Sequence, residues 1–470
     1  MNRTLLIVSL AAIVAGKAVP AQGAPSTAEA RAAARLESIR GDTVALLHVL
    51  RDMPKGGDLH NHLSGAVPAE STVRWAAADG LCVDTMTMSL IPAPCAIGGT
   101  RVSATRVEAD AALRRRAVDA WSMQEWKPGA ESGADHFFAT FLKVSPLEYR
   151  RLGDMIAAVV SHAAAHHVSY VELMVDPDSS RIARLGARIG WNPDLGVMRR
   201  RLDSAGLGDT IRKATKHLDS ADAHARAVMH CGTATAGPGC GVTVRYIYYA
   251  IRSRSPDMVF AQILAGFEWP AIDSRYVALN IVAPEHDSVA VRDFALHMSM
   301  FDFLHSAFPN TGITLHAGEL SDKVATPATM RSHIRQSVEV GHARRIGHGV
   351  DVMQEDNADG LLRELHDRDV LVEVALTSND VILGVTGGRH PLAQYLSHGV
   401  PVALATDDEG VSRSDMTHEY LRAVVDQHIG YLALKEMARN SITHSFADTA
   451  TKQRLLTRLD ADFAQFEARQ

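Results

Sequence analysis

Residues 56–65 read GGDLHNHLSG and place two histidines one residue apart at the end of a short apolar run. In a β-strand, positions i and i+2 point to the same face, so His60 and His62 would project toward a common point. Such a pair can offer two nitrogen atoms to one metal ion. Taken alone, a His-x-His pair is more often an ordinary surface or core pair, so the rest of the chain must decide.

This run is the first of eight apolar, β-branched segments along the chain. Helical patterns at 147–166, 287–307 and 354–367 lie between them. Near-continuous apolar strands that alternate with helices are typical of parallel strands buried on both faces. Eight such units indicate an α/β fold of the closed (β/α)8 TIM barrel type. The predicted strands cover residues 56–63, 168–176, 242–252, 259–267, 312–318, 344–350, 369–376 and 401–406.

The main alternative to a barrel is an open, doubly wound sheet, which binds its ligand where the strand order reverses. Nucleotide-binding sheets of that class carry a glycine-rich phosphate loop after an early strand. No early strand of this chain is followed by such a loop. The barrel is therefore favoured.

Two connections are longer than a single crossover helix requires. They cover residues 65–145, after strand one, and residues 178–240, after strand two. Loops at this face of a barrel build the wall of the active site. We therefore expect one barrel domain, residues 25–470, with an enlarged loop region after strands one and two.

The composition limits the class of partner. The chain has 470 residues, 46% of them hydrophobic, and a formal net charge of -6. Nucleic-acid binding relies on a concentrated basic surface, which the sequence does not contain. A small-molecule substrate is the expected partner, with no nucleic acid.

The N-terminus has the layout of a secretory signal peptide. Arg3 precedes an apolar stretch at residues 4–15, and small residues follow near Ala21 and Ala24. The apolar stretch is too short to span a bilayer as a helix. We expect residues 1–24 to be removed and the protein to be exported, periplasmic or secreted, with no membrane attachment after cleavage. The alternative is an uncleaved anchor.

Export affects the interpretation of the four cysteines. Cys82 and Cys95 lie close together in the sequence, as do Cys231 and Cys240. In an oxidising compartment, proximity favours these two disulfides among the three pairings that four cysteines allow. The alternatives are free thiols and, less well supported by the spacing, a metal site.

Polar residues gather where the predicted strands end. Active sites of barrel enzymes lie at the C-terminal ends of the strands. Each of these residues has an ordinary structural explanation when taken alone, but together they indicate a metal site at the mouth of the barrel. The residues are His60 and His62 after strand one, His316 and Glu319 after strand five, His348 after strand six, and Asp407 and Asp408 after strand eight.

The order of the motifs MPKGGDLHNHLSG, LAGFE, TLHAGE, RIGHG and ATDD resembles the adenosine deaminase family of the metal-dependent amidohydrolases. The resemblance extends over residues 53–425 and is closest to exported members of the family, which include growth-factor-related deaminases. It implies hydrolytic deamination of adenosine or 2'-deoxyadenosine to the inosine product and ammonia.

The resemblance implies that one zinc ion is held by His60, His62, His316 and Asp407. Three neutral imidazoles and one carboxylate suit zinc, and a further position stays open for water. Cytidine-type zinc deaminases need a Cys-x-x-Cys motif, which is absent here. Binuclear amidohydrolases usually bridge their metals through a strand-four lysine, and the predicted fourth strand contains none.

The resemblance also implies roles for the other residues. His348 and Asp407 would orient the attacking water and help to remove its proton. Glu319 would protonate N1 of the purine, which requires a raised pKa. Asp408 would contact N7, and the backbone N–H of Gly266 would contact N3.

The sugar end of the site departs from the family pattern. Where typical adenosine deaminases have an aspartate that binds the ribose 5'-hydroxyl, this chain has Ser64. Loss of a charged acceptor weakens binding unless another group replaces it. Another 6-aminopurine or a 5'-modified adenosine is therefore the alternative substrate.

A second class of function is an exported binding or signalling protein with a dormant site. Metal binding alone would not require Glu319, His348 or Asp408, so their presence favours an enzyme. Glu319 also argues against a hydrolase that does not deaminate.

Overall fold

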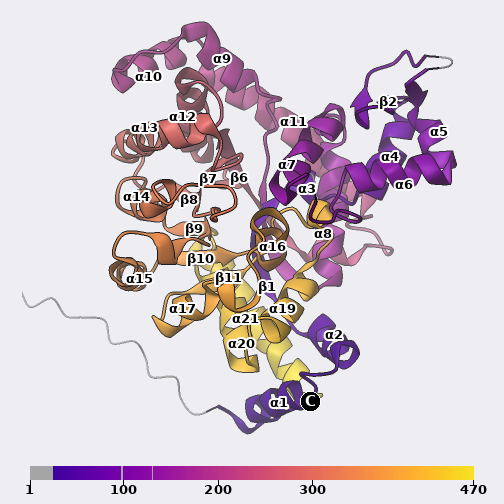
Figure 1. The fold of residues 1–470 in the computed structure, drawn as a ribbon, viewed down its shortest axis with the longest axis vertical. Coiled ribbons are helices and arrows are strands. Elements are labelled where there is room, and N and C mark those ends of the chain that lie inside the picture. The colour runs from indigo at the N-terminus through magenta and orange to yellow at the C-terminus, as the bar shows by residue number, and fades with distance from the viewer. Residues whose placement is uncertain (1–24, 97–98, 130) are drawn as a thin grey trace, which may run out of the picture.

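The computed structural model describes residues 25–96, 99–129 and 131–470 (Figure 1). The expected signal peptide, residues 1–24, lies outside the described residues. Among the residues that are described, no helix is both long enough and apolar enough to cross a membrane.

Eight parallel strands form a nearly closed barrel with helices around it, which confirms the predicted TIM-barrel fold (Figure 1). Most strand residues are buried, as expected for strands covered on both faces. In their order around the barrel, the strands are β1 Gly56–His62, β5 Val168–Met174, β6 Thr243–Ile251, β7 Tyr276–Val282, β8 Gly312–Ala317, β9 Arg345–His348, β10 Leu371–Val374 and β11 Val402–Leu404.

The barrel closes between β11 and β1 through the backbone of the predicted metal ligands. The N–H of Asp407 donates to the carbonyl of His60 at 2.8 Å, and the N–H of His62 donates to the carbonyl of Asp407 at 3.0 Å. Asp407 has a φ of +57° at this point. The closure of the barrel therefore fixes three ligand positions relative to one another.

Helices surround the barrel, and α8, α13 and α15 confirm the three predicted helical patterns. The α-helices are α1 Thr27–Ser38, α2 Thr43–Asp52, α3 Leu63–Ala66, α4 Ala69–Ala78, α5 Ala104–Ala109, α6 Ala111–Ala120, α7 Gly133–Val144, α8 Leu152–Ala165, α9 Arg181–Ile189, α10 Leu195–Ser204, α11 Leu207–Val228, α12 Pro256–Ile272, α13 Ser288–His305, α14 His333–Glu339, α15 Ala358–Asp367, α16 Leu376–Leu383, α17 Leu392–Ser397, α18 Glu409–Ser412, α19 Met416–Val425, α20 Tyr431–Thr443 and α21 Thr449–Ala468.

The prediction of a strand over residues 259–267 is wrong, because this segment lies inside helix α12. The helix is apolar nearly all round since it packs against the barrel strands β6 and β7 and also against helices α9 and α13. A short apolar run does not distinguish a strand from a buried helix. Ser255 at the N-cap and Pro256 at the first helical position were the overlooked helix signals. The fourth barrel strand is instead β7.

The two enlarged connections are built mainly of helices. The first contains α3 to α7 and a small antiparallel sheet of β2 Cys82–Asp84, β3 Ser89–Ile91 and β4 Arg101–Ser103. The second contains α9, α10 and α11. Both predicted disulfides are confirmed, Cys82 with Cys95 and Cys231 with Cys240, each with Cα atoms 5.5 Å apart.

Candidate active site

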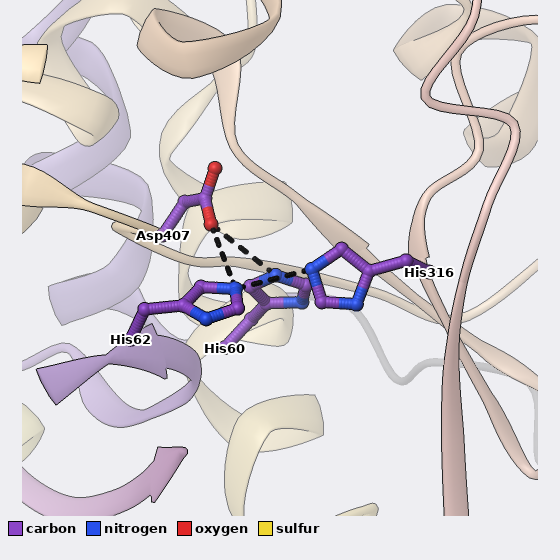
Figure 2. A group of neighbouring side chains, drawn as sticks. All are labelled: His60, His62, His316 and Asp407. Carbon is purple, nitrogen blue, oxygen red and sulfur yellow. Dashed lines mark hydrogen bonds and ion pairs between the residues drawn. The ribbon is translucent and has the colours of Figure 1, made fainter. Parts of the chain in front are cut away.

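Four predicted metal ligands meet at the C-terminal mouth of the barrel (Figure 2). His62 Nε2 lies 3.1 Å from His316 Nε2, and Asp407 Oδ1 lies 3.4 Å from Nε2 of both His60 and His62. Four ligands at roughly 2.0–2.1 Å from a tetrahedral zinc ion lie about 3.4 Å from one another. The ligand atoms are therefore spaced as the corners of one metal site.

The chemistry of the four donors also fits a metal. His60 is 1% exposed, and its Nε2 atom has no hydrogen-bond partner although it points into the cluster. A buried polar atom without a partner costs free energy unless something else satisfies it. Three imidazoles and a carboxylate suit a zinc-like divalent ion, so these residues can hold one.

The protonation of the histidines is set by their surroundings. Burial lowers the pKa of His62 to about 4 and that of His316 well below its usual range, so both imidazoles are neutral near pH 7. Burial opposes charge at His60 as well, but the nearby carboxylates of Asp407 and Glu373 raise its pKa to about 10. Metal binding would therefore release a proton from His60.

Two residues that the sequence reasoning missed hold the ligand rings from behind. Glu373 in β10 lies 2.7 Å from Nδ1 of His60, and the carboxylate also contacts Arg345 Nε at 2.6 Å. Asn280 Oδ1 in β7 lies 3.0 Å from Nδ1 of His316. Such partners fix the ring and the tautomer of a ligand histidine. Their sequence signal was a single polar residue inside an otherwise apolar strand.

Glu319 lies beside the metal ligands in a water-poor setting. Its side chain is buried and belongs to a cluster with His348 and Asp407, whose ligand atoms lie within 4.8 Å of one another. Burial raises the pKa of Glu319 well above its usual range, and the negative charges of Asp407 and Glu285 add to this effect. A carboxyl group held in the protonated form is a proton donor at neutral pH.

The backbone around Glu319 is fixed by a second buried acid. The carboxylate of Glu285, which follows β7, accepts hydrogen bonds from the N–H of Gly318 at 3.2 Å and of Glu319 at 2.8 Å. It also contacts Nδ1 of His333 at 2.7 Å. Glu285 therefore fixes the backbone that carries the Glu319 side chain.

A chain of hydrogen bonds determines which nitrogen of His348 carries its proton. The N–H of Leu392 donates to Nδ1 of His390 at 3.2 Å, so His390 donates from Nε2 to Asn379 Oδ1 at 3.1 Å. The amide nitrogen of Asn379 then donates to Nδ1 of His348 at 3.0 Å.

His348 therefore carries its proton on Nε2, which faces the site and has no partner there. Burial lowers the pKa of His348 to about 3, so the ring is neutral. Nε2 lies 3.7 Å from Glu319 Oε1. In this tautomer His348 is a hydrogen-bond donor toward the reacting atoms rather than a base.

Asp407 is the candidate base. Burial favours its neutral form, but contact with His60 and the nearby histidines His348 and His62 hold the pKa of its carboxyl group well below its usual range. Oδ1 faces the histidines, and Oδ2 accepts a hydrogen bond from Ser378 Oγ at 2.6 Å. The carboxylate is thus oriented by Ser378 in α16.

Asp408 is a buried carboxyl group next to Asp407, in surroundings that favour its neutral form. Burial and the charge of Asp407 raise its pKa well above the usual range, and its buried Oδ1 has no partner. A protonated carboxyl group can donate a hydrogen bond to an unprotonated ring nitrogen. Ser64 lies partly buried in α3, next to Gly65, which contacts Asp408.

Gly65→Ala is expected to displace Asp408 and to raise KM by ~10-fold or more, the effect of losing one good polar contact. The reason is that a Cβ atom at Gly65 would lie 1.6 Å from Asp408 Oδ1. Steady-state kinetics on the variant check this. Gly41→Ala is the control, since nothing lies within 4 Å of its Cβ position. An unchanged KM in Gly65→Ala would contradict the placement of Asp408.

The structure does not bring Gly266 to the site. It lies in α12, where a Cβ atom would be 2.7 Å from Cβ of Leu279, so the glycine lets the helix pack closely on β7. The predicted contact of Gly266 with the purine is therefore wrong, because it rested on a strand that does not exist. At the end of the true fourth strand lies Ala283, with a φ of +84°. Such strain in a non-glycine residue is common at functional sites.

The first enlarged connection covers one side of the mouth. Helix α7 packs on α16, and Phe137 of α7 belongs to an apolar cluster with Val350 and Val411, which follow β9 and β11. A hollow of about 600 Å³ lies between the start of α7 and the segments that follow β7, β8 and β10. Its lining includes Trp126, His286 and Lys323.

Comparisons with known proteins show the family and the fold to which this chain is similar. The sequence model of the family "Adenosine deaminase" matches residues 135–462, more than half of the chain. An adenine deaminase of Sinorhizobium medicae is 26% identical over 86% of this chain and 98% of its own length. An adenosine deaminase of Clostridium acetobutylicum is 32% identical over 42% of this chain and 58% of its own length.

Solved structures share the fold. An adenine deaminase from Arthrobacter aurescens superimposes with a TM-score of 0.58 at 18% identity, over 87% of this chain and 98% of its own. An amidohydrolase from Burkholderia ambifaria with bound zinc has a TM-score of 0.57 at 17% identity, over 90% and 94% of the two chains. With the match of the family model, the chain belongs to the adenosine deaminase family, hydrolases that act on the C–N bond of an aminopurine.

Proposed function

We propose that this protein deaminates adenosine and 2'-deoxyadenosine by zinc-dependent hydrolysis at C6. The observation that carries the proposal is the buried carboxyl group of Glu319, which lies beside the four candidate metal ligands in surroundings that favour its protonated form. Zinc binding alone has no use for a proton donor at this position. Hydrolysis of an aminopurine requires one, because N1 must be protonated before C6 accepts a nucleophile.

His60, His62, His316 and Asp407 would hold the zinc ion. When bound, zinc lowers the pKa of a water ligand toward about 7 and so supplies the nucleophile at neutral pH. The remaining steps belong to the side chains. Glu319 gives its proton to N1, and water adds at C6 while Asp407 accepts the proton that the water loses. Asp407 passes that proton to the amino group, which leaves as ammonia. The new hydroxyl group on C6 returns its proton to Glu319 and becomes the 6-oxo group of the product.

Two donors would orient the reacting groups. The Nε2–H of His348 points at the position of the attacking oxygen, because Asn379 occupies the other ring nitrogen. The protonated carboxyl group of Asp408 donates to N7 of the ring. The backbone contact to N3 would come from the segment after β7 near Ala283 instead of from Gly266.

A second candidate substrate is favoured by the sugar end of the site. Ser64 stands where the family has an aspartate for the 5'-hydroxyl, and the Sinorhizobium relative that aligns over most of this chain is an adenine deaminase. Adenine and 5'-modified adenosines do not require that aspartate. They are therefore the alternative to adenosine.

The ultraviolet spectra of adenine compounds and their 6-oxo products allow a direct test. Purified protein is assayed with adenosine, 2'-deoxyadenosine, 5'-deoxyadenosine and adenine, with and without a chelator. Chelator-sensitive turnover of adenosine supports the proposal. Turnover of adenine or 5'-deoxyadenosine alone would show a different substrate specificity with the same zinc-dependent mechanism. If zinc-loaded protein turns over none of the four compounds, a binding or signalling protein with a dormant site would be favoured.

The deamination rate is expected to fall in alkaline solution as the pH rises through the pKa of Glu319. Burial raises this pKa, so the active protonated form prevails below it and is lost above it. The check is a profile of kcat against pH, with the fold monitored by circular dichroism at each pH. A kcat that increases across the alkaline range in folded protein would contradict a proton-donor role for Glu319.

Export is proposed from the signal-like residues 1–24 and is consistent with the two disulfides. N-terminal sequencing of the protein recovered outside the cytoplasm tests it. An N-terminus at residues 22–25 supports cleavage, whereas an intact Met1 would favour an anchor. Residues 25–470 are proposed to act as one domain.

A further inference from the structure

A second group of metal-type ligands lies outside the barrel site and shares no residue with it. Helix α8 carries His162 in its last turn and ends at its C-cap residue His166, four residues further on, so the two side chains lie on one side of this helix end. Asp415, the N-cap residue of α19, faces them from the segment that follows β11. The ligand atoms of these three residues all lie within 4.8 Å of one another.

The spacing resembles that of the barrel site. Nδ1 of His166 lies 3.3 Å from Asp415 Oδ1, and the ring centroids of His162 and His166 are 4.6 Å apart. Two ligands of one tetrahedral zinc ion lie about 3.4 Å apart, given bonds of roughly 2.0–2.1 Å. In the barrel site, the corresponding distances from His60 and His62 to Asp407 are 3.4 Å.

Neighbouring side chains hold the two imidazoles in place. Glu409 Oε1 lies 3.0 Å from Nδ1 of His162, which leaves Nε2 of that ring for a metal. A carboxylate behind a histidine in this way raises its strength as a ligand. Thr417 Oγ1 lies 2.8 Å from Nδ1 of His166, the nitrogen that also faces Asp415, so a metal at this nitrogen would replace the hydrogen bond to Thr417.

The local charges allow a cation to bind. Burial lowers the pKa of His166 to about 4, so this imidazole is neutral near pH 7. The carboxylates of Asp415 and Glu409 both face the pair of histidines. Lys55 and Arg51 are the opposing positive groups, and Lys55 is buried and donates to the carbonyl groups of Leu50 and Met53.

The group is also accessible from solvent. The side chains of His162 and Asp415 are 38% and 31% exposed, whereas that of His166 is 12% exposed. Water can therefore complete the coordination of a bound ion, as is usual when a protein supplies three ligands.

We propose that His162, His166 and Asp415 form a second site for a divalent transition metal ion of the zinc type. The ion would join α8, which precedes β5, to the segment that follows Asp407 and Asp408. It would thus connect two parts of the chain that are about 250 residues apart in sequence. The proposal does not depend on the deaminase reaction.

Metal content of the full-length protein tests this site. The chain is stripped with a chelator, loaded with zinc chloride, passed through a desalting column and measured by elemental analysis. We expect two zinc ions per chain in the wild type and one in His162→Ala/His166→Ala. The control is His224→Ala, because His224 contacts Asp154 at 2.9 Å without belonging to a metal-type cluster, and it should keep two.

A third variant distinguishes the second site from the barrel site. His316→Ala is expected to lose the barrel ion and to keep the ion at His162, so it should contain one zinc ion per chain. If the paired histidine variant does not fold, Asp415→Asn replaces it and should also hold one ion, with its deaminase activity intact. A wild type that holds one ion, or a paired variant that still holds two, overturns the second site and leaves the barrel site standing.

Discussion

Glu319→Gln is expected to lower kcat for deamination by about 10³-fold, within the range that general acid–base groups contribute. Glutamine has nearly the shape of glutamate and can still donate a hydrogen bond to N1, but it cannot transfer a proton. The backbone at this position is held by Glu285 and does not depend on the side chain of Glu319. The variant should therefore fold and bind substrate while chemistry is slow.

The measurement is steady-state kinetics on the substrate that the wild type turns over best, together with metal analysis. Glu339→Gln is the matched control, since Glu339 is an exposed residue of α14 that pairs with Arg335 on the protein surface. We expect Glu319→Gln to keep its metal, because Glu319 is not one of the four ligands. If this variant keeps the wild-type kcat, Glu319 is not the proton donor of the reaction.

His316→Ala is expected to remove the barrel metal and to lower kcat/KM by ~10⁴-fold, because the metal supplies the nucleophile. Each tenfold loss corresponds to about 1.36 kcal/mol of lost transition-state stabilisation. His316 is the penultimate residue of β8 and one of three imidazoles in the candidate ligand set. Its Nε2 lies 3.1 Å from that of His62, so its removal opens one corner of the site. The remaining ligands cannot enclose the ion.

Elemental analysis and activity are measured on the same preparation. His305→Ala is the control, because His305 lies at the end of α13 and stacks on His342 away from the ligand set. Full activity in a His316→Ala protein that has lost the barrel metal would show that the reaction does not use it. Retention of the barrel metal would show that His316 is not a ligand.

Local patterns in the sequence were sufficient for most of the barrel. Seven of the eight predicted strands overlap the observed ones, because a strand buried on both faces needs a continuous apolar run and that need is local. The segment at 259–267 failed for the same reason, since a helix buried on all sides needs the same run. Helix α12 and strand β7 are distinguished by what packs around them.

The ligand residues could be predicted because of where parallel strands end. His60, His316 and Asp407 lie far apart in sequence, but each lies close to the C-terminal end of a strand, and all strands of a barrel end at one rim. Gly266 shows the limit of this reasoning. The sequence around Gly266 resembles the family motif, but the structure places Gly266 in helix α12 and not at the end of a barrel strand.

The sequence by itself determined the barrel class, the two disulfide pairs and the side chains gathered at the mouth, because strand periodicity, proximity and strand ends are local properties. Only the tertiary structure decided the supporting groups: Glu373 behind His60, Asn280 behind His316, and the path from His390 through Asn379 that sets the tautomer of His348. These contacts join residues from different strands and loops, so no local pattern contains them. The physical reason is that hydrogen bonds and burial depend on distances in space, which arise only when the barrel has closed.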